Sequence, residues 1–248
     1  MRLVRAEFLK LRKRRGLVAV ASVLTIAPVL VGYTVVSILH ATDPDKYDPA
    51  GGLDNLHGSL ELVTQIGVVA AILIGATAGA GDRGAGIFRE LVVTGRSRLQ
   101  LFAARIPGGL ALLLPLVGLA IALATIASVV LAGDQQSPVT AEIAVRYAAW
   151  TGLASIVAFL LALGVSSALG SRGTSIGILL AWQLAVAPIL LASGKLDNVL
   201  PNAALLALQP AESAEVVSTS TATAVVLLAA WTLVPIAAGA WRTRTADA

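Results

Sequence analysis

The sequence predicts an all-α integral membrane protein with six transmembrane helices. Its 18 basic and 14 acidic residues all lie outside six long apolar stretches. A hydrocarbon core about 30 Å thick needs about 20 helical residues to cross it. A charge at the centre of such a helix would cost roughly 2.5–3.5 kcal/mol, and the two-residue alternation of a membrane β-barrel is absent. The expected spans are Leu17–Leu39, Leu62–Gly81, Ile106–Gly133, Tyr147–Leu169, Thr174–Gly194 and Ala222–Trp241.

Composition indicates a single transmembrane domain over residues 1–248. Hydrophobic residues make up 57% of the chain and charged residues only 13%. The remaining polar residues could not coat a globule with six buried core helices. The first apolar stretch follows a basic leader, but it is longer than the core of about 7–15 residues in a signal peptide. We therefore expect it to remain as an uncleaved first span.

The distribution of Lys and Arg predicts the orientation in the membrane. Most of them lie in the N-terminal arm, in the loop after the second span, in the fourth loop (Arg172) and after the last span. Only Lys46, Arg146 and Lys195 fall on the other side. By the positive-inside rule, we expect a multi-pass protein of the cell (plasma) membrane with both termini in the cytoplasm. The sequence pI near 9.9 then reflects contact with membrane lipids, and we expect no nucleic-acid partner.

Residues 1–16 are expected to form an amphipathic helix on the cytoplasmic leaflet. Apolar residues recur there at helical spacing, and basic residues occupy most other positions. Each basic residue near anionic headgroups adds about 1 kcal/mol of attraction. The alternative is a topogenic charge cluster without fixed structure. The expected membrane-interface residues are Val4, Phe8, Leu11, Arg12, Lys13, Arg14 and Arg15.

Two glycine pairs at four-residue spacing allow close approach between helices. Gly75 and Gly79 lie in the second span, and Gly173 and Gly177 lie at the start of the fifth. Such pairs serve packing within one bundle or contact between two chains, and the sequence leaves both open. Several spans also contain prolines, which kink transmembrane helices where neighbours satisfy the freed carbonyls.

The segment Pro201–Pro210, PNAALLALQP, precedes the last span. It is too apolar for a solvated loop and too short to cross a bilayer. We expect an extracellular segment that re-enters the outer leaflet. The alternative is a short helix packed on the extracellular mouth without a function.

Catalytic, cofactor-binding and metal-binding sites are not predicted in this chain. Its two histidines, His40 and His57, both lie in the first outer loop, and no HExxH pattern occurs. Gly194-Lys195 is followed by Leu196, where a P-loop requires Ser or Thr. We therefore expect a non-enzymatic subunit, with any ATP hydrolysis on a separate chain. The absence of acidic residues and His within the spans disfavours an ion-coupled carrier.

The cytoplasmic loop between the second and third spans is too long for a simple hairpin. Gly84 and Gly86 allow a sharp exit from the membrane. Ile87, Phe88, Leu91 and Val92 follow as an apolar patch at helical spacing. Such a short amphipathic helix suits a groove on a soluble partner. The alternative is a helix that lies flat on the bilayer.

Three segments resemble permease subunits of ATP-binding-cassette (ABC) transporters of the type-two exporter family. MRLVRAEFLKLRKRRG is similar to the N-terminal elbow helix of that family, and RGAGIFRELVVTGRSR to the region that contains its coupling helix. PNAALLALQP resembles its extracellular re-entrant helices. One departure is Gly86-Ile87, where many relatives carry Thr before the coupling helix.

The resemblance implies a permease domain without bound cofactors. It works with a separate ABC ATPase that holds ATP and Mg, and with a second permease copy or a homologous permease. The spans offer a largely neutral path, which favours export of a hydrophobic or amphipathic substrate. Two alternatives remain: a non-transporting membrane anchor or sensor, and an ion-coupled carrier. The implied ATPase-contact residues are Ile87, Phe88, Arg89, Glu90, Leu91 and Val92.

Overall fold

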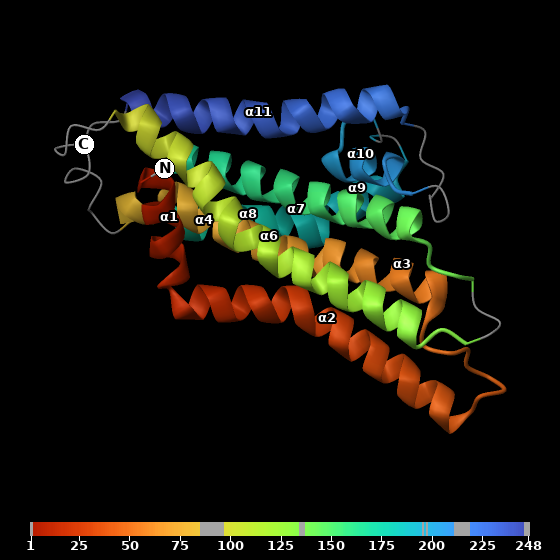
Figure 1. Cartoon of the computed structure of the whole chain (residues 1–248). Coiled ribbons are helices and arrows are strands. Elements are labelled where there is room, and N and C mark those ends of the chain that lie inside the picture. The colour runs from red at the N-terminus through yellow and green to blue at the C-terminus, as the bar shows by residue number, and fades with distance from the viewer. Residues whose placement is uncertain are drawn as a thin grey trace.

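The computed structural model describes residues 2–84, 97–133, 137–194, 196, 198–210 and 219–245. These residues form helices joined by loops, and the described segments contain no strand, which confirms the predicted fold class (Figure 1). The helices are α1 (Arg2–Arg12), α2 (Arg15–Thr42), α3 (Gly52–Leu62), η1 (Val63–Gly67), α4 (Val68–Gly84), α6 (Arg98–Val130), α7 (Ala141–Leu169), α8 (Arg172–Ala181), η2 (Trp182–Val186), α9 (Ala187–Ala192), α10 (Pro201–Ala207) and α11 (Thr221–Thr245).

In the described part of the chain, six helical units are long and apolar enough to cross a membrane, as predicted. Two of them are composite. Helices α3, η1 and α4 make one unit, Gly52–Asp82, and α8, η2 and α9 make another, Arg172–Ala192. The second unit starts at Gly52 rather than near Leu62, because Leu56 and Leu60 of α3 are fully buried against neighbouring helices.

Helix α7 lies between α4 and α11, and glycines set both contacts. A Cβ added at Gly75 would lie 2.5 Å from the carbonyl oxygen of Phe159, and one at Gly79 would lie 2.6 Å from that of Leu163. The α4 glycine pair therefore packs within the bundle. Gly173 and Gly177 of α8 differ, because an added Cβ there meets nothing within 4 Å among the described atoms.

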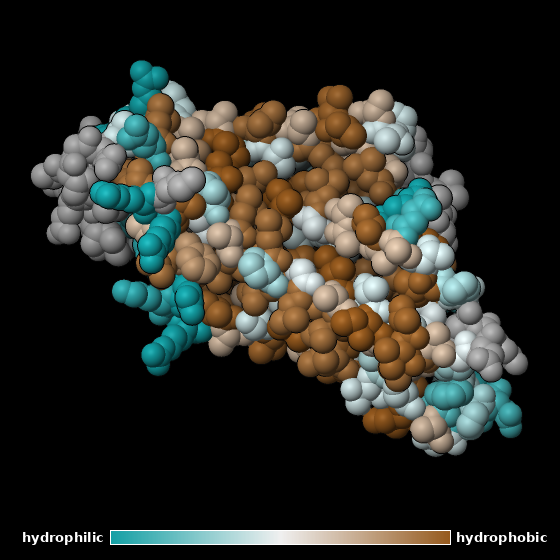
Figure 2. Space-filling model, in the orientation of Figure 1, coloured by the Kyte–Doolittle hydropathy of each residue, from teal (hydrophilic) through white to brown (hydrophobic). Residues whose placement is uncertain are grey.

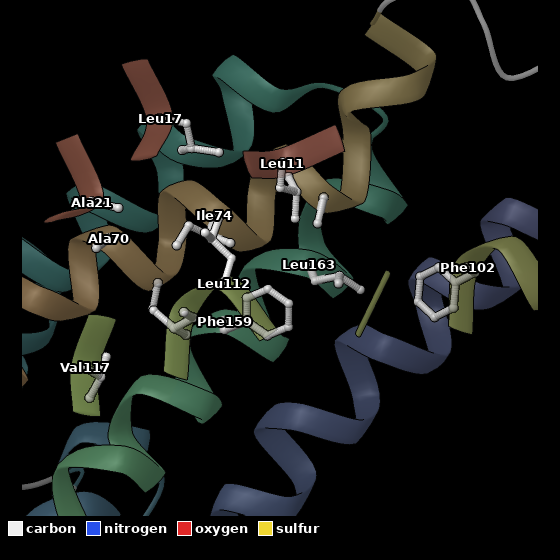
Figure 3. Close-up of a cluster of buried hydrophobic side chains, with 13 residues drawn as sticks. Leu11, Leu17, Ala21, Ala70, Ile74, Phe102, Leu112, Val117, Phe159 and Leu163 are labelled. Carbon is white, nitrogen blue, oxygen red and sulfur yellow. The ribbon is translucent and has the colours of Figure 1, made fainter. Parts of the chain in front are cut away.

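Helix α1 packs on the bundle. Leu11 is fully buried and belongs to the same apolar cluster as Ile74 of α4 and Phe159 of α7 (Figure 3). At Gly108 of α6, an added Cβ would lie 2.6 Å from the Cβ of Glu7, so the two helices touch closely. The apolar stripe of the N-terminal segment thus faces protein along α6.

The surface has an apolar band between two hydrophilic ends (Figure 2). Large apolar side chains of the long helical units are exposed, including Val23 of α2 (61%), Ile126 of α6 (60%) and Ile189 of α9 (70%). Such an extensive exposed apolar surface is stable in lipid rather than in water, so the chain is a multi-pass membrane protein. We call one end the basic end; it carries α1, the start of α6 and the end of α11, where Arg98 Nη1 donates to the carbonyl of Arg244 at 3.3 Å.

Candidate functional site

A buried charge cluster joins three helices at the basic end. Arg105 of α6 donates from Nη2 to Asp82 Oδ2 at 3.0 Å and from Nη1 to the carbonyl of Gly79 at 2.8 Å. Lys10 of α1 donates to Asp82 Oδ1 at 2.8 Å, and Glu7 lies beside Lys10. The side chains of Asp82 and Arg105 are only 1% and 2% exposed. The four charges balance, which a buried cluster requires.

The charge cluster lies at the base of the loop between α4 and α6, which the sequence predicted to contact a soluble partner. Asp82 lies near the end of α4, and Arg105 lies in the second turn of α6, so their ion pair ties together the two helices that flank this loop. The predicted ATPase-contact residues, Ile87 to Val92, lie outside the described residues. Ser97 begins the described chain after the loop, and its hydroxyl accepts from the Gln100 N–H at 3.2 Å as a helix N-cap.

The predicted membrane-interface residues fall into two groups. Val4 and Phe8 are half-buried and Leu11 is fully buried, all on the side of α1 that meets the bundle. Arg12, Lys13 and Arg15 are exposed, and Arg14 is half-buried. The basic residues therefore remain free to meet headgroups, while the apolar residues hold α1 to the protein.

Toward the opposite end, a pocket of about 450 Å³ opens between η1 and α4, α7, the α8–η2–α9 unit, and α10. We call it the interhelical pocket. This volume is within the range of small-molecule sites, which are mostly apolar with a few placed polar groups. The apolar lining includes Val68, Ile72 and Leu179, and two indoles, Trp150 and Trp182, also line it. The polar lining consists of Glu61, Thr64, Gln65, Gln183 and Asn202.

Both π-helical stretches of the described chain line the interhelical pocket. Stretch η1 contributes Thr64 and Gln65, and η2 contributes Trp182 and Gln183. Pro188 explains η2, because proline has no N–H for the carbonyl four residues earlier, and a local π adjustment accommodates the loss. Short π stretches inside α-helices occur frequently at functional sites.

Helix α10 closes the pocket at the end away from the charge cluster, and side chains from several helices fasten it. Trp150 Nε1 donates to the carbonyl of Leu205 at 2.8 Å. Asn202 Nδ2 donates to Gln183 Oε1 at 3.4 Å. Just after α10, Gln209 Nε2 lies 2.8 Å from His57 Nε2 of α3. The predicted re-entrant segment is thus a short helix clamped over the pocket.

Sequence reasoning placed Glu61 and His57 in the first outer loop, whereas the structure places both on α3. Glu61 then lines the interhelical pocket, which therefore contains one carboxylate. Gln65 and Gln183 could have indicated the pocket from the sequence, because long polar side chains are rare within transmembrane helices and mark functional positions. Lys10 and Arg105 were interpreted only as topology signals, and their meeting at Asp82 was missed.

The described residues contain no group of three or more His, Cys, Asp or Glu side chains placed to hold a metal ion. The arrangement consists of a pocket and a buried charge cluster, with α4 running from one to the other. The sequence matches no protein-family model. A search of curated proteins likewise finds no match to it.

Proposed function

We propose that this chain is the permease subunit of an ABC exporter, with its basic end in the cytoplasm. One observation carries the proposal. The composite helix Gly52–Asp82 runs without interruption from the interhelical pocket to the charge cluster at the base of the loop. Its 31 residues correspond to about 46 Å of helix. A displacement at the loop can therefore reach the pocket through α4, which is a regular α-helix from Asp82 back to the lining residues Val68 and Ile72.

The charge cluster makes the base of the loop rigid. A partner bound to residues 87–92 would push on α4 and α6 together, because Asp82 and Arg105 link them. Helix α1 would move with them through Lys10. In this proposal, ATP closes the ATPase pair and favours one of two arrangements of the bundle, which requires ATP to bind that arrangement better.

The substrate is bound in the interhelical pocket. Its walls are mostly apolar with amide and indole groups, which suits a hydrophobic or amphipathic molecule. The two π-helical stretches mark where α3–α4 and α8–α9 depart from regular geometry beside the substrate. A change at these points would alter the pocket while the rest of each helix stays intact.

A second permease, either another copy of this chain or a homologue, completes the transporter. Both the α8–η2–α9 unit and α11 have room for it, because only 17% of the most apolar window of each is buried in the described chain; the glycines of α8 favour the former. Gly173 and Gly177 lie on this unit with open space beside them. Small residues of this kind allow close contact between transmembrane helices.

The decisive experiment removes the proposed ATPase contact. The tagged chain is purified from its native membranes, and both co-purifying ATP hydrolysis and the identity of the ATPase are measured. Phe88→Asp with Leu91→Asp should abolish ATPase co-purification while the chain still inserts. Gln135→Asp with Gln136→Asp adds the same charge in the loop between the third and fourth spans and should change nothing. Full retention of the ATPase by the first variant would refute this assignment.

Reconstitution separates the two alternatives. Purified chain alone in liposomes, with an ion gradient and no ATP, should show no substrate flux; such flux would favour an ion-coupled carrier. The complex with its ATPase should show ATP-dependent flux. ATP hydrolysis that is independent of substrate and unaccompanied by flux would favour a membrane anchor or sensor.

A further inference from the structure

The interhelical pocket contains an acidic group that the proposed function does not explain. Glu61 lies in α3, just before η1, and its side chain is 45% exposed. Among the described lining residues it carries the only charge. It therefore sits where the apolar lining meets solvent, at the end of the pocket away from the basic end.

The partners of Glu61 leave its charge uncompensated. Gln65 Nε2 donates to its Oε1 at 3.0 Å, which is a neutral contact. Within the described chain, no Lys or Arg forms an ion pair with Glu61, and its one potential cationic partner is His57 Nε2 at 3.9 Å. His57 could neutralise the carboxylate only when protonated.

A second contact engages His57. Its Nε2 lies 2.8 Å from Gln209 Nε2, so this nitrogen already has a partner nearer than Glu61, which is 3.9 Å away. The nearer contact of Glu61 is the neutral amide of Gln65. In the described chain, its carboxylate therefore lies at the edge of the pocket with no Lys or Arg beside it.

The rest of the pocket suits the body of a ligand whose charge meets Glu61. Indole rings attract organic cations and pack well on apolar rings. Trp150 and Trp182 both line the pocket, and Trp182 also packs on Trp231 with the ring centroids 5.7 Å apart. Val68, Ile72 and Leu179 supply an apolar wall deeper in the pocket. We propose that the interhelical pocket binds amphiphiles that carry a protonated amine, with the amine at Glu61 and the apolar body against this wall.

This inference names the substrate class of the proposed exporter. That these ligands are transported rests on the proposed function, whereas their binding does not. Its test is binding to the chain alone, without ATP or ATPase. The probes are dansylcadaverine, which carries a cationic primary amine, and its neutral N-acetyl derivative. Both are titrated against the protein in phosphatidylcholine nanodiscs, and energy transfer from tryptophan to dansyl is measured.

The wild-type chain should bind the amine about tenfold more tightly than the acetylated probe, a difference of about 1.4 kcal/mol. Glu61→Gln preserves size and hydrogen bonding and should remove this preference. Asp54→Asn removes the same charge from an exposed position on the same helix and should retain the preference. Ala158→Phe fills the pocket and should weaken both probes alike.

Three results would overturn the assignment: equal affinities of the wild-type chain for the two probes, an unchanged preference in Glu61→Gln, or an equal loss in Asp54→Asn. The last result would mean that general surface charge attracts the amine. Size-exclusion profiles establish that each variant is folded. Because ATPase co-purification is measured separately, failure here leaves the proposed permease role standing, and loss of the ATPase interaction leaves this binding result standing.

Discussion

Arg105 and Asp82, which lie on different helices, form an ion pair of 3.0 Å at the base of the loop between α4 and α6, with almost no exposure of either side chain. Breaking a buried pair by removing one partner leaves a buried charge and typically costs about 3–5 kcal/mol. Arg105→Met should therefore lower the thermal stability of the purified chain strongly. Fluorescence-detected size exclusion after heating measures the effect.

Two further variants test whether the loss of stability in Arg105→Met comes from the broken ion pair. Asp82→Leu combined with Arg105→Met removes both charges, and it should be more stable than Arg105→Met alone because Lys10 and Glu7 still balance each other. Arg172→Met changes an exposed arginine at the same end and should have little effect. If the double variant is less stable than Arg105→Met, the pair is not the main source of the loss.

A second prediction concerns the close contact between α4 and α7. In Gly79→Ala, the new Cβ would lie 2.0 Å from Ser166 Oγ and 2.6 Å from the carbonyl oxygen of Leu163. Because backbone atoms cannot rotate away, we expect a loss of about 1–3 kcal/mol, as for other overpacked sites. Gly177→Ala meets nothing within 4 Å and should not be destabilised. Equal melting temperatures for the two variants would contradict the packing described for Gly79.

The open glycines of α8 lead to a third prediction. Gly173→Leu with Gly177→Leu should leave the thermal stability of the single chain unchanged, because the new side chains meet no described atoms. It should weaken association with a second permease, because bulk at a small-residue face separates helices. Cross-linking in native membranes measures association. Unchanged cross-linking would place the partner on another face.

A fourth prediction concerns the hold of α7 on α10. Trp150→Phe removes the indole N–H that donates to the carbonyl of Leu205. A net loss of about 1 kcal/mol should speed hydrogen exchange in Pro201–Ala207 about fivefold. Trp241→Phe alters an indole that is 67% exposed and serves as the control. The clamp would be disproved by unchanged exchange in this helix.

The fifth prediction tests orientation and uses the absence of cysteine from the chain. Asp45→Cys should react with a membrane-impermeant maleimide in intact cells. Arg244→Cys should react only after permeabilisation, because basic flanks stay in the cytoplasm. The reverse pattern would place the loop between α4 and α6 outside the cell and would refute the ATPase contact.

Much of the fold was predictable, and much of the site was not. The six spans follow from the lengths of the uncharged stretches, and the structure confirms that number in the residues that it describes. The helix around Glu61 was missed, because a rule that ends spans at charges cannot detect that Leu56 and Leu60 keep the helix buried for another turn or more. The third span was expected to begin at Ile106, whereas α6 runs unbroken from Arg98, and Arg105 within it is paired rather than solvated.

The sequence by itself determined that this chain crosses a membrane and how often, because the cost of a charge in hydrocarbon applies to each stretch separately. Only the tertiary structure decided which residues meet. Lys10 and Asp82 are 72 residues apart, and Gln209 and His57 are 152 apart. The spans are apolar on nearly every face, so their periodicity does not mark the face that meets a neighbour. Packing of small residues makes that choice, and it depends on the shapes of both helices.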